Sequence, residues 1–138
     1  MNIALVTDDY IPYSTRIAGK MLHELSVCLN EMGHSVTVIT PHFSNQKFIQ
    51  EEIDNIKIWR FKSGVIKNVN LFIRAINESF LSYRAWNAIK KKVTTKSFDA
   101  VIYYSPSIFW GNLVKNLKKR CNCKFFLILR DLFPQWVV

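Results

Sequence analysis

Glycine is scarce in this sequence, and its absence from the first part of the chain excludes two large classes of nucleotide-binding site. Only four of the 138 residues are glycine, and none lies between Met1 and Gly19. The loop that follows the apolar run at residues 3–7 therefore carries neither G-x-G-x-x-G nor a P-loop, whose glycines let the backbone approach phosphates closely. A dehydrogenase-type site is not expected, and no cofactor is expected in this chain.

Cysteine is equally scarce, with only Cys28, Cys121 and Cys123. An odd number of cysteines, in a chain without a basic segment followed by an apolar signal region, favours reduced thiols and a cytoplasmic location. Cys121 and Cys123 have no histidine or further cysteine nearby in sequence to complete a zinc site, so we expect structural thiols and no metal. No apolar run approaches the roughly 20 residues that a helix needs to cross a bilayer.

Acidic residues become rare after residue 61. Residues 1–61 contain five Lys or Arg against seven Asp or Glu, whereas residues 62–96 contain eight against one and residues 97–138 six against two. The net charge of +9 is thus concentrated in the second half, which predicts one positive face. An aromatic residue beside a lysine cluster is typical of a helix on an anionic membrane surface, and here these residues are Trp86, Lys90, Lys91 and Lys92. The alternative is that the lysines are simply exposed to solvent. No nucleic-acid-binding motif is present, so nucleic acid is not an expected partner.

What the sequence does contain is an alternation of short apolar runs with amphipathic stretches. Strands are predicted at residues 3–7, 35–40, 56–61, 100–104 and 124–129, and helices at residues 18–32, 68–92 and from residue 105 onward. Gly33 is expected to end the first helix. The pattern predicts an α/β fold, a Rossmann-like open parallel sheet in the order 3-2-1-4-5 with helices on both faces. The third strand is expected at the sheet edge and the fifth to be covered on both faces, while residues 42–55 show no clear pattern.

Ligands of such sheets bind beyond the carboxyl ends of the strands, where the strand order reverses. The crevice is then expected between the first and fourth strands, lined by residues 8–16, 104–107 and 130–136. Asp131 is the candidate catalytic carboxylate, although a structural contact with Arg130 is equally plausible, and Ser105 suits helix capping better than ligand binding. The substrate-binding residues predicted in these loops are Asp9, Tyr10, Ser14, Thr15, Arg16, Ser105, Arg130 and Asp131.

The first of these loops leads directly into a helix. The backbone amides near Ser14 and Thr15 suit a phosphate or carboxylate, with Arg16 adding positive charge, but either hydroxyl suits a helix cap equally well. Asp8 and Asp9 suit sugar hydroxyls or proton transfer. As neighbours at a strand exit they point in different directions, so they form no ready-made acid and base pair, and one of them is as well suited to anchoring the loop.

Several motifs along the chain resemble the start of family-4 glycosyltransferases of the GT-B fold. D-Y-x-P occupies residues 9–12, and G-H-S-V-T-V occupies residues 33–38. Y-Y-S-P at residues 103–106 and L-R-D-L-F-P-Q-W at residues 129–136 are similar to the subgroup that builds bacterial O-antigen or capsule, such as N-acetyl-L-fucosamine transferases. The resemblance runs along the whole chain, and the last motif is its most distinctive part.

The resemblance implies a two-domain enzyme that transfers a sugar with retention and usually without a metal. Residues 1–138 would form a truncated N-terminal domain that binds the acceptor, a polyprenyl-diphosphate-linked saccharide at the cytoplasmic side of the inner membrane, in O-antigen (lipopolysaccharide) synthesis. The nucleotide sugar would bind a C-terminal domain with an E-x7-E element, which is absent here. One departure is Arg16-Ile17, where many members have paired glycines. The alternative is a non-catalytic α/β module that binds a ligand or partner in the same crevice.

Overall fold

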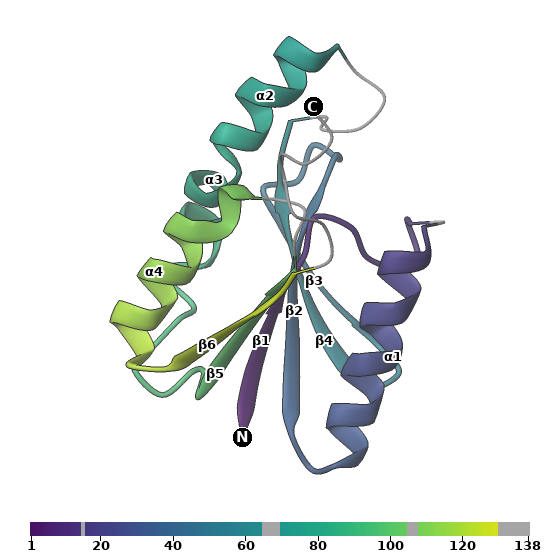
Figure 1. Cartoon of the computed structure of the whole chain (residues 1–138), viewed down its shortest axis with the longest axis vertical. Helices are drawn as coiled ribbons and strands as arrows, with labels where there is room; N and C mark the ends of the chain where they lie inside the picture. Colours follow the sequence, from purple (N-terminus) through teal and green to yellow (C-terminus); the bar gives the residue numbers. More distant parts are fainter. Residues whose placement is uncertain (15, 65–69, 105–107, 130–138) are drawn as a thin grey trace.

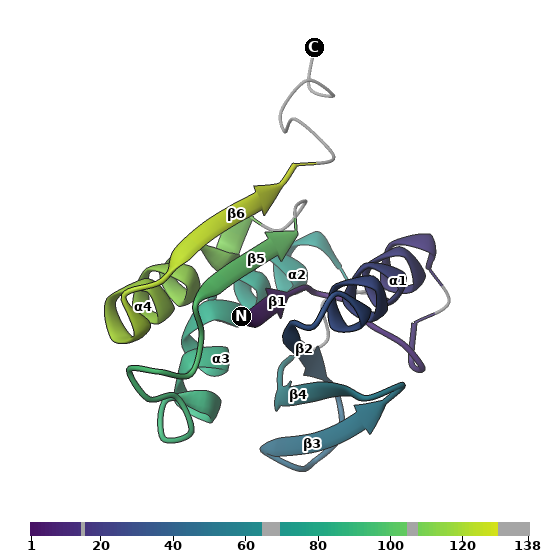
Figure 2. The ribbon, with the colours of Figure 1, turned by 90° about the horizontal axis from the view of Figure 1, so that it is seen from below.

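The computed structural model describes residues 1–14, 16–64, 70–104 and 108–129 (Figure 1). The elements are β1 (Asn2–Val6), α1 (Ile17–Glu31), β2 (Ser35–His42), β3 (Phe48–Ile53), β4 (Ile56–Lys62), α2 (Leu71–Ser79), α3 (Leu81–Ile89), β5 (Ala100–Tyr104), the 3-10 turn η1 (Ile108–Trp110), α4 (Gly111–Cys121) and β6 (Lys124–Ile128). They form three layers, with α1 on one face of a single sheet and α3 and α4 on the other (Figure 1, Figure 2).

The sheet has the order β3-β4-β2-β1-β5-β6. β1 pairs in parallel with β2 and β5, and β2 with β4 and β5 with β6 are also parallel pairs. These five strands are the five predicted runs in the predicted order, so the fold class is confirmed. β1 lies at the centre, and its residues Ile3, Ala4, Leu5 and Val6 are all buried, as a strand covered on both faces requires.

The third predicted strand, β4, does not lie at the edge as expected, because β3 pairs antiparallel along it. Asp54 and Asn55 connect the two strands with positive φ angles of 50° and 61°. This is the backbone of a two-residue hairpin turn, which Asp, Asn and Gly favour. The sequence prediction missed β3 because its polar side chains obscure the alternation. The signal that could have found it was the D-N pair between two strand-like runs.

Helix α1 faces the core through Leu22, and Ala18, Leu25 and Leu29 pack against the same cluster. Gly19, Leu22, His23 and Ser26 are its buried residues, whereas Met21 is 41% exposed. His23 is a polar residue on this buried side, with only 8% of its surface exposed. A Cβ at Gly19 would lie only 3.1 Å from the Ser14 side chain, so glycine allows the loop to pack against the helix. The helix ends before Gly33, whose φ of 85° matches the predicted stop.

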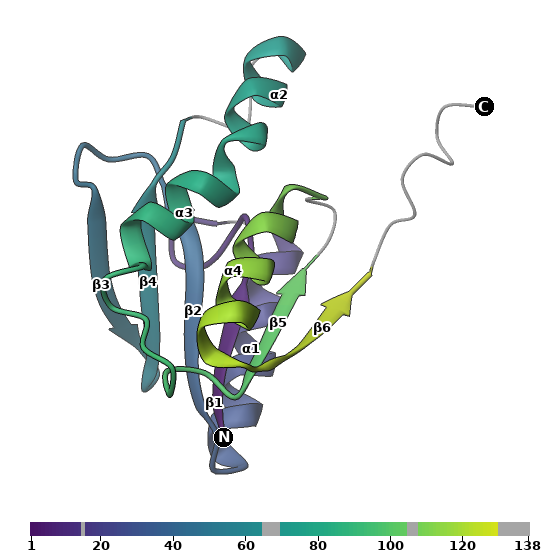
Figure 3. The same ribbon diagram turned by 90° about the vertical axis from the view of Figure 1, so that its left-hand side faces the viewer.

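The single long helix predicted for residues 68–92 is two helices, with Phe80 between them. Helix α3 packs on the sheet, and its residues Leu81, Ala85 and Ile89 are fully buried. Helix α2 instead extends beyond the sheet at the carboxyl ends of the parallel strands (Figure 1, Figure 3). In the described part of the chain, no helix combines the length and apolarity needed to cross a membrane.

Strand β6 forms the other edge of the sheet and contradicts the expectation of a strand covered on both faces. Phe125, Phe126 and Leu127 are 46%, 56% and 45% exposed. The sequence prediction relied on the apolar composition of the strand, which the described residues do not bury. Residues 130–138 lie outside the described residues.

Candidate functional site

A cavity of about 300 Å³ lies at the carboxyl ends of β1, β2 and β4. This is the edge at which ligands of parallel α/β sheets bind. The cavity lies on the β2 side of β1, however, whereas the predicted crevice lies on the β5 side. Four chain segments line it, and their residues are Asp8, Asp9, Tyr10, Tyr13, Pro41, His42, Phe43, Ser44, Ile49 and Arg60.

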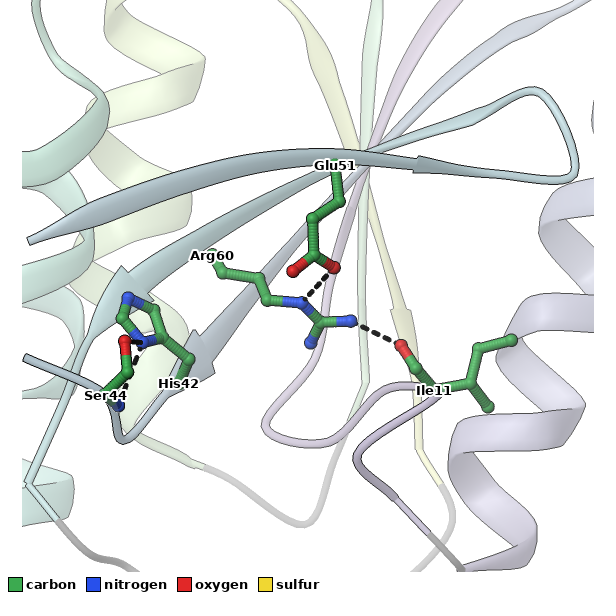
Figure 4. A network of polar contacts seen from close by, with 5 residues as sticks. All are labelled: Ile11, His42, Ser44, Glu51 and Arg60. Carbon is green, nitrogen blue, oxygen red and sulfur yellow. Dashed lines mark hydrogen bonds and ion pairs between the residues drawn. The ribbon is translucent and has the colours of Figure 1, made fainter. Parts of the chain in front are cut away.

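Arg60 is the buried cation of this cavity, with only 1% of its surface exposed. Its Nε donates a hydrogen bond to Glu51 Oε2 at 2.8 Å, and its Nη2 donates to the carbonyl oxygen of Ile11 (Figure 4). The ring of Tyr13 lies over the guanidinium, with its centroid 4.7 Å from Cζ. Arg60 therefore joins β4 to β3 and to the loop after β1, and holds the walls of the cavity together.

His42 ends β2 and is 6% exposed. Its Nδ1 accepts a hydrogen bond from the backbone N–H of Ser44 at 3.1 Å and lies 2.9 Å from Ser44 Oγ (Figure 4). Its Nε2 is buried and has no hydrogen-bond partner among the described residues. Burial lowers the pKa of His42, and the positive charge of Arg60 lowers it further, so the imidazole is neutral at pH 7.

The loop after β1 brings three of the predicted site residues together. Ser14 Oγ donates to Asp9 Oδ2 at 2.5 Å and accepts the N–H of Arg16 at 3.1 Å. Thr7 Oγ1 also bonds the backbone of Asp9. Asp9 thus anchors the loop while its carboxylate borders the cavity. A carboxylate beside the start of α1 interacts favourably with the helix dipole and would repel a phosphate placed there.

Tyr10 has a structural contact in addition to its place in the cavity wall. Its hydroxyl lies 2.9 Å from His23 Nδ1, and His23 Nε2 lies 2.8 Å from Asp54 Oδ2 in the β3–β4 turn. Tyr10 is 2% exposed, and burial raises its pKa to about 12. The chain of contacts links the loop after β1 to α1 and the hairpin, so Tyr10 helps to fix the position of the cavity wall.

The remaining predicted residues of the site lie outside the described residues. These are Thr15, Ser105, Arg130 and the candidate catalytic carboxylate Asp131. Of the predicted crevice between β1 and β5, the structure therefore describes residues 8–14, Arg16 and Tyr104, and the roles of these four residues stay predictions.

The predicted membrane-facing residues are not next to the most exposed apolar surface. Trp86 is half-buried and packs against the core, whereas Lys90, Lys91 and Lys92 are exposed after α3. Arg120 Nη2 donates to the carbonyl of Lys90 at 3.2 Å, beside the end of α4, whereas Lys92 Nζ lies 4.9 Å from the ring centroid of Phe48 on β3. Several exposed apolar residues lie instead on α2, between α2 and α3, and on the first turn of α3. They are Phe72, Ile73, Ile76, Phe80 and Tyr83.

The three cysteines are free thiols. Cys121 and Cys123 are buried where α4 meets β6, and Cys121 Sγ lies 3.3 Å from the carbonyl oxygen of Thr94. Burial raises the pKa of both thiols. A buried, protonated thiol is a poor nucleophile and a poor metal ligand, so these contacts fit a packing role.

The sequence prediction missed Arg60, His42 and Glu51 as residues of the site. One signal was available: Arg60 shares strand parity with the apolar residues Ile56 and Ile58, and all three are buried. An arginine at a core position needs a charged partner. Its partner Glu51 lies on β3, the strand that the prediction did not find.

Comparisons with known proteins bear on the fold. No family model matches the chain, and no curated protein matches it in sequence. Its structure is similar to the E. coli trehalose-6-phosphate protein bound with UDP-2-fluoro glucose, a glycosyltransferase of the GT-B fold, with a TM-score of 0.62 and 10% identity. The match covers 96% of this chain and 33% of that one, so the chain spans about a third of its neighbour. The fold is thus that of one GT-B half-domain.

Proposed function

We propose that this chain is the acceptor-binding half of a glycosyltransferase that moves a sugar from a nucleotide sugar to a saccharide acceptor. The observation that carries the proposal is a GT-B half-domain fold along 96% of the chain, together with a cavity at the carboxyl ends of its strands. Carboxylates, a histidine and aromatic rings line that cavity, and such groups suit a ligand with many hydroxyls. In this proposal the donor binds a second domain outside residues 1–138.

The sequence resemblance supports the finer part of the proposal. The motifs at residues 103–106 and 129–136 favour O-antigen synthesis, with a polyprenyl-diphosphate-linked saccharide as the acceptor and an N-acetyl-L-fucosamine-type transfer. Asp131 is proposed as the catalytic carboxylate, with Ser105 and Arg130 at the acceptor. Transfer is proposed to proceed with retention and without a metal.

A lipid-linked acceptor requires a membrane contact close to the cavity. Helix α2 extends from the same end of the sheet as the cavity (Figure 1), and Phe72 is 73% and Ile76 43% exposed. An apolar helix face in the bilayer interface would bring the cavity towards a lipid-linked substrate. Three lysines lie away from that face, so their proposed contribution is long-range electrostatic attraction to anionic lipid and not insertion. They are Lys90, Lys91 and Lys92.

The activity is tested on the complete reading frame that contains residues 1–138. We expect the purified product to transfer sugar from one of a panel of UDP-, GDP- and dTDP-sugars to a polyprenyl-diphosphate-linked N-acetylhexosamine, detected by mass spectrometry. Asp131→Asn is expected to abolish the transfer, and residues 1–138 alone are expected to be inactive. Transfer by the isolated chain would contradict the proposal. A complete protein that turns over no nucleotide sugar would favour the non-catalytic module.

The membrane contact is tested by sedimentation with phosphatidylglycerol-containing vesicles. We expect Phe72→Ser/Ile76→Ser to weaken binding at all salt concentrations, because it removes exposed apolar surface. Lys90/Lys91/Lys92→Glu should weaken binding mainly at low salt, by at least tenfold, since each basic residue near such a surface contributes about 1 kcal/mol. Phe126→Ser, at an exposed position on β6, is the matched control. Equal sedimentation of the wild-type protein and all variants would remove the membrane claim.

A further inference from the structure

We propose that Tyr13 and Arg60 act as a positioning pair, which holds the loop after β1 in the conformation that binds the acceptor. The inference rests on the proposed acceptor role, and it adds two residues that control the same site. The structure describes residues 8–14 and Arg16 of this loop. Three observations carry the inference: the contacts of Arg60, the exposure of Tyr13 and the place of both residues in the cavity wall.

Arg60 reaches the loop from the neighbouring hairpin. It lies on β4, is only 1% exposed, and its Nη2 donates a hydrogen bond to the carbonyl oxygen of Ile11 (Figure 4). Its Nε donates to Glu51 Oε2 on β3 at 2.8 Å. The guanidinium is planar and rigid, so its bond to Glu51 also fixes the direction of its bond to the loop. The β3–β4 hairpin therefore provides a fixed support for the loop.

Tyr13 provides a second contact between the loop and Arg60. The centroid of its ring lies 4.7 Å from Arg60 Cζ, which is within the range of a cation–π contact. Because 74% of Tyr13 is exposed, this side chain adds little to the core. An exposed ring on a buried guanidinium can move away while the fold stays intact. The stack thus contributes more to the position of the loop than to the stability of the protein.

The two ends of the loop have anchors of their own. At its start, the hydroxyl of Tyr10 lies 2.9 Å from His23 Nδ1. At its end, Ser14 Oγ donates to Asp9 Oδ2 at 2.5 Å. The residues that contact Arg60 lie between these anchors along the chain. We therefore expect loss of the Arg60 contacts to loosen the middle of the loop while its ends stay in place.

Both members of the pair line the cavity at the carboxyl ends of β1, β2 and β4, so the position of the loop shapes one cavity wall. The apparent dissociation constant of a ligand rises as the binding-competent conformation becomes less populated. A loosened loop would weaken acceptor binding, whereas the complex, once formed, keeps the same geometry. The pair therefore predicts an effect on KM for the acceptor, and none on kcat or on KM for the donor.

Three substitutions separate positioning from folding. Tyr13→Leu removes the ring and Tyr13→Phe keeps it, while Arg60→Lys keeps the charge and loses the planar contacts. Tyr13→Leu is the decisive variant where Arg60→Lys reduces stability. Phe126→Leu removes an exposed ring on β6, and Arg120→Lys replaces an arginine that also donates to a backbone carbonyl. These two variants are the matched controls, because neither residue lines the cavity.

The stack is measured first by NMR in residues 1–138, without substrate. An aromatic ring shifts the resonances of nuclei above it, so the Arg60 Nε–H signal reports the stack directly. We expect Tyr13→Leu to move this signal and to shift or broaden the backbone amides within residues 8–14, with the urea midpoint unchanged. Tyr13→Phe should retain the wild-type spectrum. The inference is overturned if the Arg60 signal does not move, or if the loop amides respond no more than in Phe126→Leu.

Kinetics of the complete protein then test the consequence for the acceptor, with the polyprenyl-diphosphate-linked N-acetylhexosamine as the probe. We expect Tyr13→Leu to raise the acceptor KM by about two- to fivefold, the size of an exposed cation–π contact. Arg60→Lys should raise it by about three- to tenfold, because the bond to the Ile11 carbonyl is lost as well. The double variant should fall short of the product of the two effects, since the residues form one contact.

The outcomes distinguish this inference from the proposed function. If the complete protein transfers sugar but the acceptor KM of Tyr13→Leu equals that of Phe126→Leu, or if kcat falls instead, the inference fails and the proposed function stands. If the complete protein transfers no sugar but Tyr13→Leu still moves the Arg60 signal and the loop amides, the proposed function fails. The pair then stands as a control of the cavity wall.

Discussion

At the β3 edge of the sheet, polar side chains are buried and paired, whereas at the β6 edge apolar side chains are exposed. Arg60 and Glu51 join β4 to β3, and His23 reaches Asp54 in the turn between them. At the opposite edge, Phe125 and Phe126 are each about half exposed. An exposed apolar edge strand can pair with another polypeptide chain. Proteins ordinarily prevent this by covering the edge or by placing charged residues on it. The β3 edge is thus held by polar contacts within the chain, whereas β6 leaves apolar surface exposed among the described residues.

The largest expected difference between the two edges concerns one phenylalanine on each side. Phe61 is fully buried and meets Trp110 edge-to-face, with ring centroids 6.2 Å apart. We expect Phe61→Ala to lower the free energy of unfolding by about 3–5 kcal/mol, because it leaves a cavity in the core. Phe126→Ala, at 56% exposure, should change it by less than about 0.5 kcal/mol. Urea unfolding of residues 1–138 measures both.

Equal losses in the two variants would contradict this difference, because Phe126 would then be as well packed as Phe61. A gain of stability or solubility in Phe126→Ala would support it further, since the exposed apolar surface at β6 would then be a source of association. Analytical ultracentrifugation of the wild-type protein and Phe126→Ala separates the two effects.

The fold was predictable where burial alone sets the pattern. β1, β2 and β5 are apolar runs in the middle of the sheet. Helical segments separate these runs in the sequence, and this alternation indicates a parallel α/β sheet. The two edges were not predictable in the same way. β3 has polar residues facing solvent, and β6 has an apolar composition that its described neighbours do not bury. Edge strands depend on what lies beside them, which a single sequence does not state.

The candidate site was predictable only in part, for a related reason. The first loop was found from the residues after β1, and the structure joins Asp9, Ser14 and Arg16 there. The cavity is also lined by His42 and Arg60, and the contact of Arg60 with Glu51 depends on the antiparallel pairing of β3 with β4. Without that strand, an arginine in a strand pattern appears as an ordinary exposed residue. The error in the edge strand thus became an error in the site.

A smaller effect tests whether the polar contacts stabilise the β3 side. We expect Arg60→Ala to lower the free energy of unfolding by about 2 kcal/mol, because Glu51 and the Ile11 carbonyl lose their partner. This is below the ~3–5 kcal/mol of a fully buried pair, since the Glu51 side chain keeps 23% of its surface exposed. Arg120→Ala, at an exposed arginine near the β6 edge, is the matched control, and we expect a change within about 0.5 kcal/mol.

Arg60→Lys adds a second test, because it keeps the charge but loses the planar guanidinium that contacts Glu51 and Ile11 together. We expect it to recover less than half of the loss. Full recovery would mean that charge alone matters at this position, and an unchanged Arg60→Ala would mean that the ion pair contributes no net stability.

The smallest expected effect is the alkaline dependence that Tyr10 gives to the β3 side. Burial raises its pKa from 10.0 to about 12, so the folded state keeps the proton where the unfolded chain releases it. This contribution to stability is complete below pH 10 and is lost as the pH rises to 12. Tyr10→Phe should cost about 1 kcal/mol at neutral pH, through the lost contact with His23. It should then flatten the fall in unfolding free energy between pH 10 and pH 12.

Tyr83→Phe is the matched control, because it removes a phenol that is 67% exposed. The difference between the two variants isolates the contribution of Tyr10, because the rest of the chain is the same in both. If both variants flatten the curve equally, the alkaline dependence does not come from the buried phenol. If only Tyr10→Phe does, the chain of contacts from Tyr10 through His23 to Asp54 contributes to the stability of the β3 side.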